Sequence, residues 1–131
     1  MTLPLTVTLA TSASLALLGT VIAVRVAMAR AKYGILVGDG GNADLIVRMR
    51  THANFVEYVP LILIQLALLE LSGANRTILI FCGCLLFLAR LLHAVGMALP
   101  APNASRAIGT AATTLLVVFL AGYGLALIFW R

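Results

Sequence analysis

The chain has 131 residues, of which 63% are hydrophobic and 10% are charged, and its formal net charge is +5. A soluble globular domain is about 45–50% apolar and about 25% charged, so this composition excludes a soluble fold and, for the same reason, intrinsic disorder. A membrane-spanning helix needs about 20 apolar residues. The chain therefore has room for about four spans in a single membrane domain.

The basic residues do not form a polar face with interleaved aromatic side chains, as a nucleic-acid-binding surface would require. They cluster near the ends of the apolar segments, where Lys and Arg set the orientation of membrane helices. We therefore expect the chain to lie in the lipid bilayer and not to bind nucleic acid.

The first predicted span covers residues 3–29, and a glycine-rich loop at residues 37–42 follows it. The second predicted span covers residues 44–72, with Asp44 as its N-cap and Pro60 inside it. A helix of this length measures about 43 Å, so its polar beginning should project past the hydrocarbon.

A tight turn at residues 72–75 separates the second span from the third, which we predict at residues 76–99. A loop at residues 100–103 leads to the fourth span, at residues 104–130. The third span contains Cys82 and Cys84, which we expect to be small core residues because they match no zinc-ligand spacing. These elements predict an all-α integral membrane protein, a four-helix transmembrane bundle with no metal site.

The basic residues are distributed unevenly between the two sides of this predicted bundle. Seven lie in or beside the first and third loops: Arg25, Arg30, Lys32, Arg48, Arg50, Arg90 and Arg106. The opposite side has only Arg76 and Arg131. Because loops rich in Lys and Arg stay in the cytoplasm, we expect loops one and three to be cytoplasmic and both termini to be on the outer side.

The head of the second span carries a polar stripe. Arg50, Asn54, Glu57 and Tyr58 have the spacing i, i+4, i+7 and i+8, which places them on one face of a helix. Such groups cannot face lipid without a cost of several kcal/mol, so they face protein or a wet cavity. A structural network, with Arg50 paired to Glu57 or to another helix, is one explanation. A ligand-binding site is the other explanation, and it accounts better for the presence of four different polar groups on one helix face.

The third span offers a second stripe, formed by Arg90, His93 and Met97. Arg106 opens the fourth span on the same side of the membrane. A small anionic ligand among these arginines and Arg50 is chemically sensible, because guanidinium groups pair with carboxylates through two hydrogen bonds. His93 and His52 can equally be interfacial packing residues, or ligands of a bis-histidine haem.

The pattern Arg50-x-x-x-Asn54-x-x-Glu57-Tyr58-x-Pro60 at the head of the second of four spans resembles the MAPEG family, the membrane-associated proteins in eicosanoid and glutathione metabolism. The resemblance covers the whole chain and includes Arg90 and Arg106. The sequence from His52 to Phe55 is most similar to bacterial members, which implies a bacterial inner membrane. Where eicosanoid-type members carry tyrosines on the third helix, this chain has His93 and Met97.

The resemblance implies a homotrimer with a glutathione site at each subunit interface, open toward the cytoplasm. Glutathione would act as a cosubstrate, and the reaction would be transfer to lipophilic electrophiles or reduction of peroxides. The resemblance assigns catalysis to Arg106, as the residue that stabilises the thiolate. It assigns glutathione binding to a larger set: Arg30, Arg50, Asn54, Glu57, Tyr58, Arg90 and His93.

Two alternatives remain open from the sequence. One is a small four-span transporter that uses Glu57, although such exporters usually carry their membrane carboxylate in the first span. The other is a non-catalytic membrane scaffold or a haem-binding subunit. Thiol-dependent activity, proton-coupled efflux and haem absorption would distinguish the three.

Overall fold

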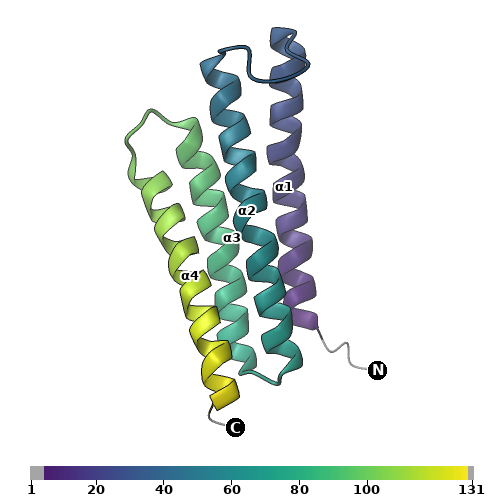
Figure 1. Ribbon diagram of the computed structural model, residues 1–131, viewed down its shortest axis with the longest axis vertical. Helices are drawn as coiled ribbons and strands as arrows, with labels where there is room; N and C mark the ends of the chain where they lie inside the picture. Colours follow the sequence, from purple (N-terminus) through teal and green to yellow (C-terminus); the bar gives the residue numbers. More distant parts are fainter. Residues whose placement is uncertain (1–4, 130–131) are drawn as a thin grey trace.

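The structure, a computed structural model, describes residues 5–129 and consists of four long helices joined by short connections (Figure 1). They are α1 (Thr6–Tyr33), α2 (Ala43–Leu71), α3 (Arg76–Ala98) and α4 (Ala104–Phe129). Each of the four is long and apolar enough to cross a membrane. The all-α prediction with four candidate spans is therefore confirmed.

The helix ends differ from the sequence-based boundaries near the first loop. α1 continues to Tyr33, four residues beyond the expected end, and stops where Gly34 adopts φ 66° and its N–H bonds to the Arg30 carbonyl. The predicted N-cap of α2 was wrong, because Asn42 rather than Asp44 accepts the hydrogen bond from the Leu45 N–H at 3.0 Å. The expected start at residue 3 and end at residue 130 lie outside the described residues.

The helices run antiparallel, and Figure 1 shows α1 and α4 at opposite edges with α2 and α3 between them. Within the described chain α1 makes no packing contact with α4. We call the end with the α1–α2 and α3–α4 connections the loop end. We call the other end, with the α2–α3 turn, the start of α1 and the finish of α4, the turn end.

An apolar core runs along the bundle, and its fully buried members include Leu15, Ile62, Leu66, Leu86 and Leu120. Large apolar side chains also cover the outside of the helices. Because lipid is as apolar as this core, close packing holds the helices together more than removal of apolar surface from water does.

The two cysteines of α3 differ in their surroundings. Cys82 is buried in the core, as expected, whereas Cys84 is exposed, which corrects the prediction that both are core residues. The physical reason is that residues two apart on a helix point to different faces.

Glycines allow α3 and α4 to approach closely at the loop end. A methyl group added at Gly96 would collide with the backbone of Arg106. A methyl group added at Gly109 would lie 2.7 Å from both the Ala89 carbonyl oxygen and the backbone nitrogen of His93. Small residues commonly serve this purpose in membrane helix pairs. Here they bring the start of α4, which carries Arg106, against the part of α3 that carries His93.

Candidate functional site

A polar cavity lies at the loop end, where α2, α3 and α4 meet. Its volume is about 60 Å³, and the residues that line it come from all three helices: Arg50, Asn54, Glu57, His93, Met97 and Arg106. Five of the eight site residues predicted from the sequence are in this list. The structure thus brings three of the four residues of the α2 polar stripe together with Arg106, the arginine that opens α4.

The charged side chains of this cavity are not neutralised within the described chain. Arg50, Glu57 and Arg106 are exposed. Among the described residues, the one ion pair joins Arg48 to Asp44, and no hydrogen bond engages the side chains of these three residues. An internal pair between Arg50 and Glu57, the structural alternative, is therefore not formed in this structure.

Arg90 lies under the cavity rather than in its wall. Its side chain is only 2% exposed, and its guanidinium donates to Asn54 Oδ1 at 2.7 Å, Thr113 Oγ1 at 2.6 Å and the Gly109 carbonyl at 3.2 Å. The guanidinium carbon also lies 5.9 Å from the centre of the Tyr58 ring. A buried cation needs such partners. Arg90 and Tyr58 therefore form a support layer below the cavity.

This support layer fixes the orientation of one cavity residue. Arginine has only donors, so the atom of Asn54 that faces Arg90 must be the amide oxygen. The amide nitrogen of Asn54 then points away from Arg90, and no hydrogen bond occupies it within the described part of the chain. Asn54 consequently offers N–H donors at a cavity that already carries two guanidinium groups.

Arg30 does not converge with the other predicted site residues in the subunit. It closes α1, and its guanidinium donates to three carbonyls of the first loop, those of Ile35, Leu36 and Gly38, at 3.3, 3.4 and 2.9 Å. Its other nitrogen lies 3.4 Å from the Met49 sulfur. Arg30 therefore shapes the α1–α2 loop.

The two histidines occupy different positions. His93 is 5% exposed and packs against Gly109 at the α3–α4 contact, with the cavity on its other side. His52 is half-buried on α2 and does not line that cavity. In the described residues, no group of three or more His, Cys, Asp or Glu side chains lies close enough to hold a metal ion.

Sequence reasoning missed Thr113 and Gly109, which complete the Arg90 site from α4. Thr113 is 1% exposed, and its hydroxyl also donates to the Gly109 carbonyl of its own helix at 2.8 Å. A hydroxyl in an apolar span, at a membrane depth close to that of a buried arginine, is the signal that could have identified the pair. The spacing along α4 alone gives no such indication.

A second polar network, also missed, lies at the turn end. The Glu70 carboxylate accepts hydrogen bonds from the Val7 and Thr8 N–H groups at 2.8 Å and from the Thr8 hydroxyl at 2.7 Å. It thereby caps α1 from the last turn of α2, where a carboxylate is favoured by the dipole of the facing helix start. This network joins α1 to α2 at the turn end, and its hydrogen bonds use both oxygens of the Glu70 carboxylate.

The chain is similar in sequence to known proteins. The profile of the MAPEG family matches residues 8–126. The chain is 36% identical over 67 residues to the inner membrane protein YecN of Escherichia coli K12, and equally to that of Escherichia coli O6:H1 strain CFT073. These matches cover 51% of this chain and 51% of each relative, so the match spans about half the length of the curated relatives.

No solved structure matches the chain. The four candidate spans, together with the inner membrane relatives, support a multi-pass protein of a bacterial inner membrane. The family profile covers nearly the whole four-helix bundle, including every residue that lines the polar cavity. The chain therefore belongs to the MAPEG family.

Proposed function

We propose that this protein is a membrane-embedded glutathione-dependent transferase or peroxidase that acts on lipophilic electrophiles. The observation that carries the proposal is the cavity at the loop end, where two guanidinium groups, one carboxylate and one oriented amide meet without pairing among themselves. A site built in this way needs a ligand with complementary charges. Membership of the MAPEG family points to glutathione as that ligand.

The cavity offers partners for one carboxylate, the ammonium group and the thiol of glutathione. Glutathione carries two carboxylates, one ammonium group and one thiol. Arg50 and the Asn54 amide nitrogen can bind a carboxylate, since guanidinium and amide N–H groups are its natural donors. Glu57 can accept hydrogen bonds from the ammonium group. Arg106, at the start of α4, then remains for the thiol sulfur.

The chemistry assigned to Arg106 follows from electrostatics. A nearby guanidinium lowers the pKa of a thiol, and the thiolate rather than the thiol is the nucleophile. In the transferase reaction the sulfur forms a bond to an electrophilic carbon, and a leaving group departs with its electron pair. In the peroxidase reaction two thiols become a disulfide while a hydroperoxide is reduced to an alcohol and water.

A single subunit offers only part of this site. Ligand pockets for small molecules usually measure about 300–1,000 Å³, whereas the cavity measures about 60 Å³. We propose that a homotrimer completes it, with each site between two subunits. Arg30 would then reach the rim of the neighbouring subunit's site from its place at the end of α1. A hydrophobic electrophile would arrive from the bilayer between the helices.

The proposal is tested by a thermal-shift titration in detergent with glutathione and with an S-blocked analogue, together with initial rates on a generic electrophile. We expect stabilisation by both ligands at millimolar concentration and a rate that depends on glutathione. Arg50→Ala should remove the stabilisation. Lys32→Ala is the matched control, because it deletes an exposed cation at the same end that lies 5.1 Å from the centre of the Tyr33 ring.

Absence of stabilisation by either ligand, with no thiol-dependent rate, would overturn the proposal. Proton-coupled efflux lost in Glu57→Gln would favour the transporter instead. A haem absorption band that disappears in His52→Ala or His93→Ala would favour the haem-binding subunit.

A further inference from the structure

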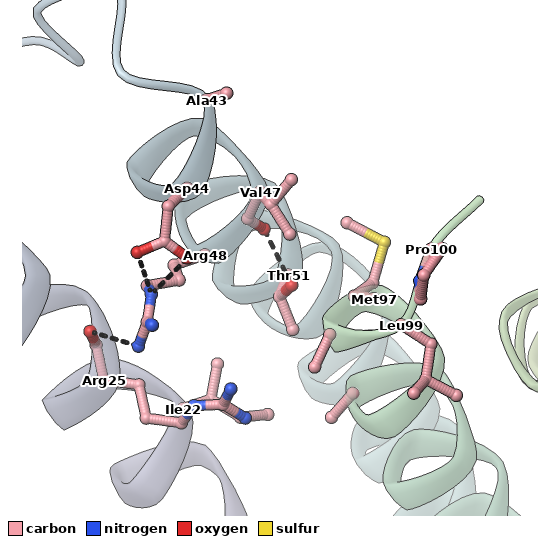
Figure 2. Close-up of a pocket in the computed structure, with 12 residues that line it drawn as sticks. Ile22, Arg25, Ala43, Asp44, Val47, Arg48, Thr51, Met97, Leu99 and Pro100 are labelled. Carbon is pink, nitrogen blue, oxygen red and sulfur yellow. Dashed lines mark hydrogen bonds and ion pairs between the residues drawn. The ribbon is translucent and has the colours of Figure 1, made fainter.

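A second, larger pocket opens at the loop end, on a different face of α2. It measures about 430 Å³ and lies between α1, α2 and α3 (Figure 2). Its lining combines polar and apolar side chains: Ile22, Arg25, Ala43, Asp44, Val47, Arg48, Thr51, Ala94, Met97, Ala98, Leu99 and Pro100. We call it the α1–α2–α3 cleft. The glutathione proposal does not use it.

The cleft contains two arginines and one carboxylate, so one of the two cations has no acidic partner in the described part of the chain. Arg48 Nε donates to both carboxylate oxygens of Asp44, at 3.1 and 3.0 Å, and Tyr33 donates to the same carboxylate at 3.0 Å. Arg48 Nη1 reaches the Arg25 backbone carbonyl at 3.4 Å, as Figure 2 shows. Within the described residues, the guanidinium of Arg25 has no hydrogen-bond or ion-pair partner. Arg25, Arg48 and Asp44 together therefore carry a net charge of +1.

The carboxylate also orients Arg48. Because Asp44 occupies the Nε side of its guanidinium, the Nη nitrogens are directed toward α1, where Arg25 lies. Figure 2 shows both arginines on the α1 side of the cleft and Met97, Leu99 and Pro100 on the α3 side. The cleft is thus amphipathic, with donors on one wall and apolar surface on the other.

The position of Arg25 along α1 matches the edge of the bilayer. At a rise of about 1.5 Å per residue, Arg25 lies about 28 Å from the start of the helix at Thr6. The hydrocarbon core of a bilayer is about 30 Å thick. If α1 begins at one edge of the hydrocarbon, Arg25 and the bonded Arg48 lie at the level of lipid headgroups on the other side.

We propose that the α1–α2–α3 cleft binds one anionic phospholipid, whose monoanionic phosphodiester lies between Arg25 and the Nη nitrogens of Arg48. One negative charge balances the net charge of the cleft. The apolar wall from α3 receives the beginning of an acyl chain. Basic pockets between membrane helices are known to recognise anionic headgroups in this manner. The lipid would fix the start of α2 against α1, next to the loop that Arg30 organises.

The test compares lipid retention in detergent. Purified protein is equilibrated with mixed micelles of phosphatidylglycerol and phosphatidylcholine, and the lipids that remain bound are counted by mass spectrometry. A basic residue near a lipid headgroup contributes enough for a preference of about fivefold. We expect this preference for phosphatidylglycerol in the unmodified chain and its loss in Arg25→Gln.

Three variants complete the design. Arg25→Lys keeps the charge and should keep the preference. Ala98→Phe fills the cleft without changing a charge and should remove the preference for phosphatidylglycerol. Arg76→Gln removes a cation at the turn end, which donates to the Thr6 hydroxyl at 2.9 Å, and should change nothing in the lipid ratio.

An unchanged lipid ratio in Arg25→Gln would overturn the proposal, as would equal retention of the two lipids by the unmodified chain. Stabilisation by inorganic phosphate alone, as strong as that by phosphatidylglycerol, would assign the cleft to a free anion instead. A changed oligomeric state in Ala98→Phe, with an unchanged lipid ratio, would show that a second copy of the chain covers the cleft.

Discussion

The turn end and the loop end of the bundle use similar polar residues in opposite ways. At the turn end, the Glu70 carboxylate receives three hydrogen bonds from the start of α1, and the Tyr123 hydroxyl accepts one from the Asn75 N–H at 3.0 Å. At the loop end, Glu57 and two arginines face a cavity without internal partners. Both carboxylates belong to α2, Glu70 in its last turn and Glu57 at the middle of the helix.

The difference separates two tasks. Polar groups that are satisfied inside a membrane bundle hold helices together, and removing one leaves its partners exposed to lipid or buried without a hydrogen bond. Polar groups that are left open contribute little to the fold of the subunit. They keep their binding capacity for another molecule. Substitutions at the turn end should therefore change stability, and substitutions at the loop cavity should change thiol chemistry.

The largest expected effect is on the rate in Arg106→Ala. Loss of a group that stabilises charge at the reacting atom typically slows catalysis by about 100-fold or more. Because the Arg106 side chain is exposed and makes no hydrogen bond within the described chain, the melting temperature in detergent should stay the same. Initial rates at saturating glutathione measure the effect. Arg106→Lys, which keeps the charge, should retain part of the rate.

Glu70→Ala is the opposite case at the turn end. It strands the Val7 and Thr8 N–H groups and the Thr8 hydroxyl, so we expect the bundle to lose about 2–3 kcal/mol of stability. Thermal unfolding in detergent measures the loss, and the rate per folded protein should not change. Glu70→Gln keeps an acceptor and should cost less than half as much. A catalytic defect in either variant, without a stability defect, would contradict the division between the two ends.

Gly109→Ala should affect both properties, because it acts on the contact that positions the cavity. The added methyl group would lie 2.7 Å from the Ala89 carbonyl oxygen, so α4 must move away from α3. Such overpacking typically costs about 1–3 kcal/mol. The shift should also lower the rate. Gly122→Ala is the control, since an added methyl group there meets nothing within 4 Å and stability should stay equal or rise slightly.

The sequence was sufficient for the fold and for most of the cavity. Four apolar segments predict four helices because a bilayer admits few other structures. The helical spacing of Arg50, Asn54 and Glu57 places them on one face without any knowledge of tertiary structure. The structure adds the partner helix: Arg106 joins this face because the glycines of α3 and α4 let the two helices approach.

The spacing of polar residues along each helix does not predict which of them line the cavity and which lie beneath it. Arg90 was predicted as a binding residue, yet it is buried and bonded to Asn54 and Thr113, because the rotation of α3 turns it toward α4. The sequence places Arg30 with the same set, but in the structure it bonds to the loop between α1 and α2. Which polar side chains line the cavity and which lie beneath it depends on helix rotation, which residue spacing does not encode.

The smallest effect on stability is expected for Asn54→Asp, and the informative result is whether stability rises or falls. A carboxylate at position 54 pairs with the guanidinium of Arg90, which has no acidic partner among the described residues, so stability should rise by up to about 1 kcal/mol. The same substitution removes the N–H donors at the cavity and adds a negative charge near the bound carboxylate. Glutathione affinity should therefore fall.

Melting temperatures with and without glutathione measure both effects on one sample. Thr113→Val serves as the matched variant: it removes a different partner of Arg90, and so should lower stability while the Asn54 amide stays available to the ligand. If Asn54 has only a structural role, stability and glutathione affinity should rise or fall together in Asn54→Asp and in Thr113→Val. Opposite changes in Asn54→Asp would show that ligand binding depends on the N–H donors of Asn54 and not on the stability of the Arg90 layer beneath the cavity.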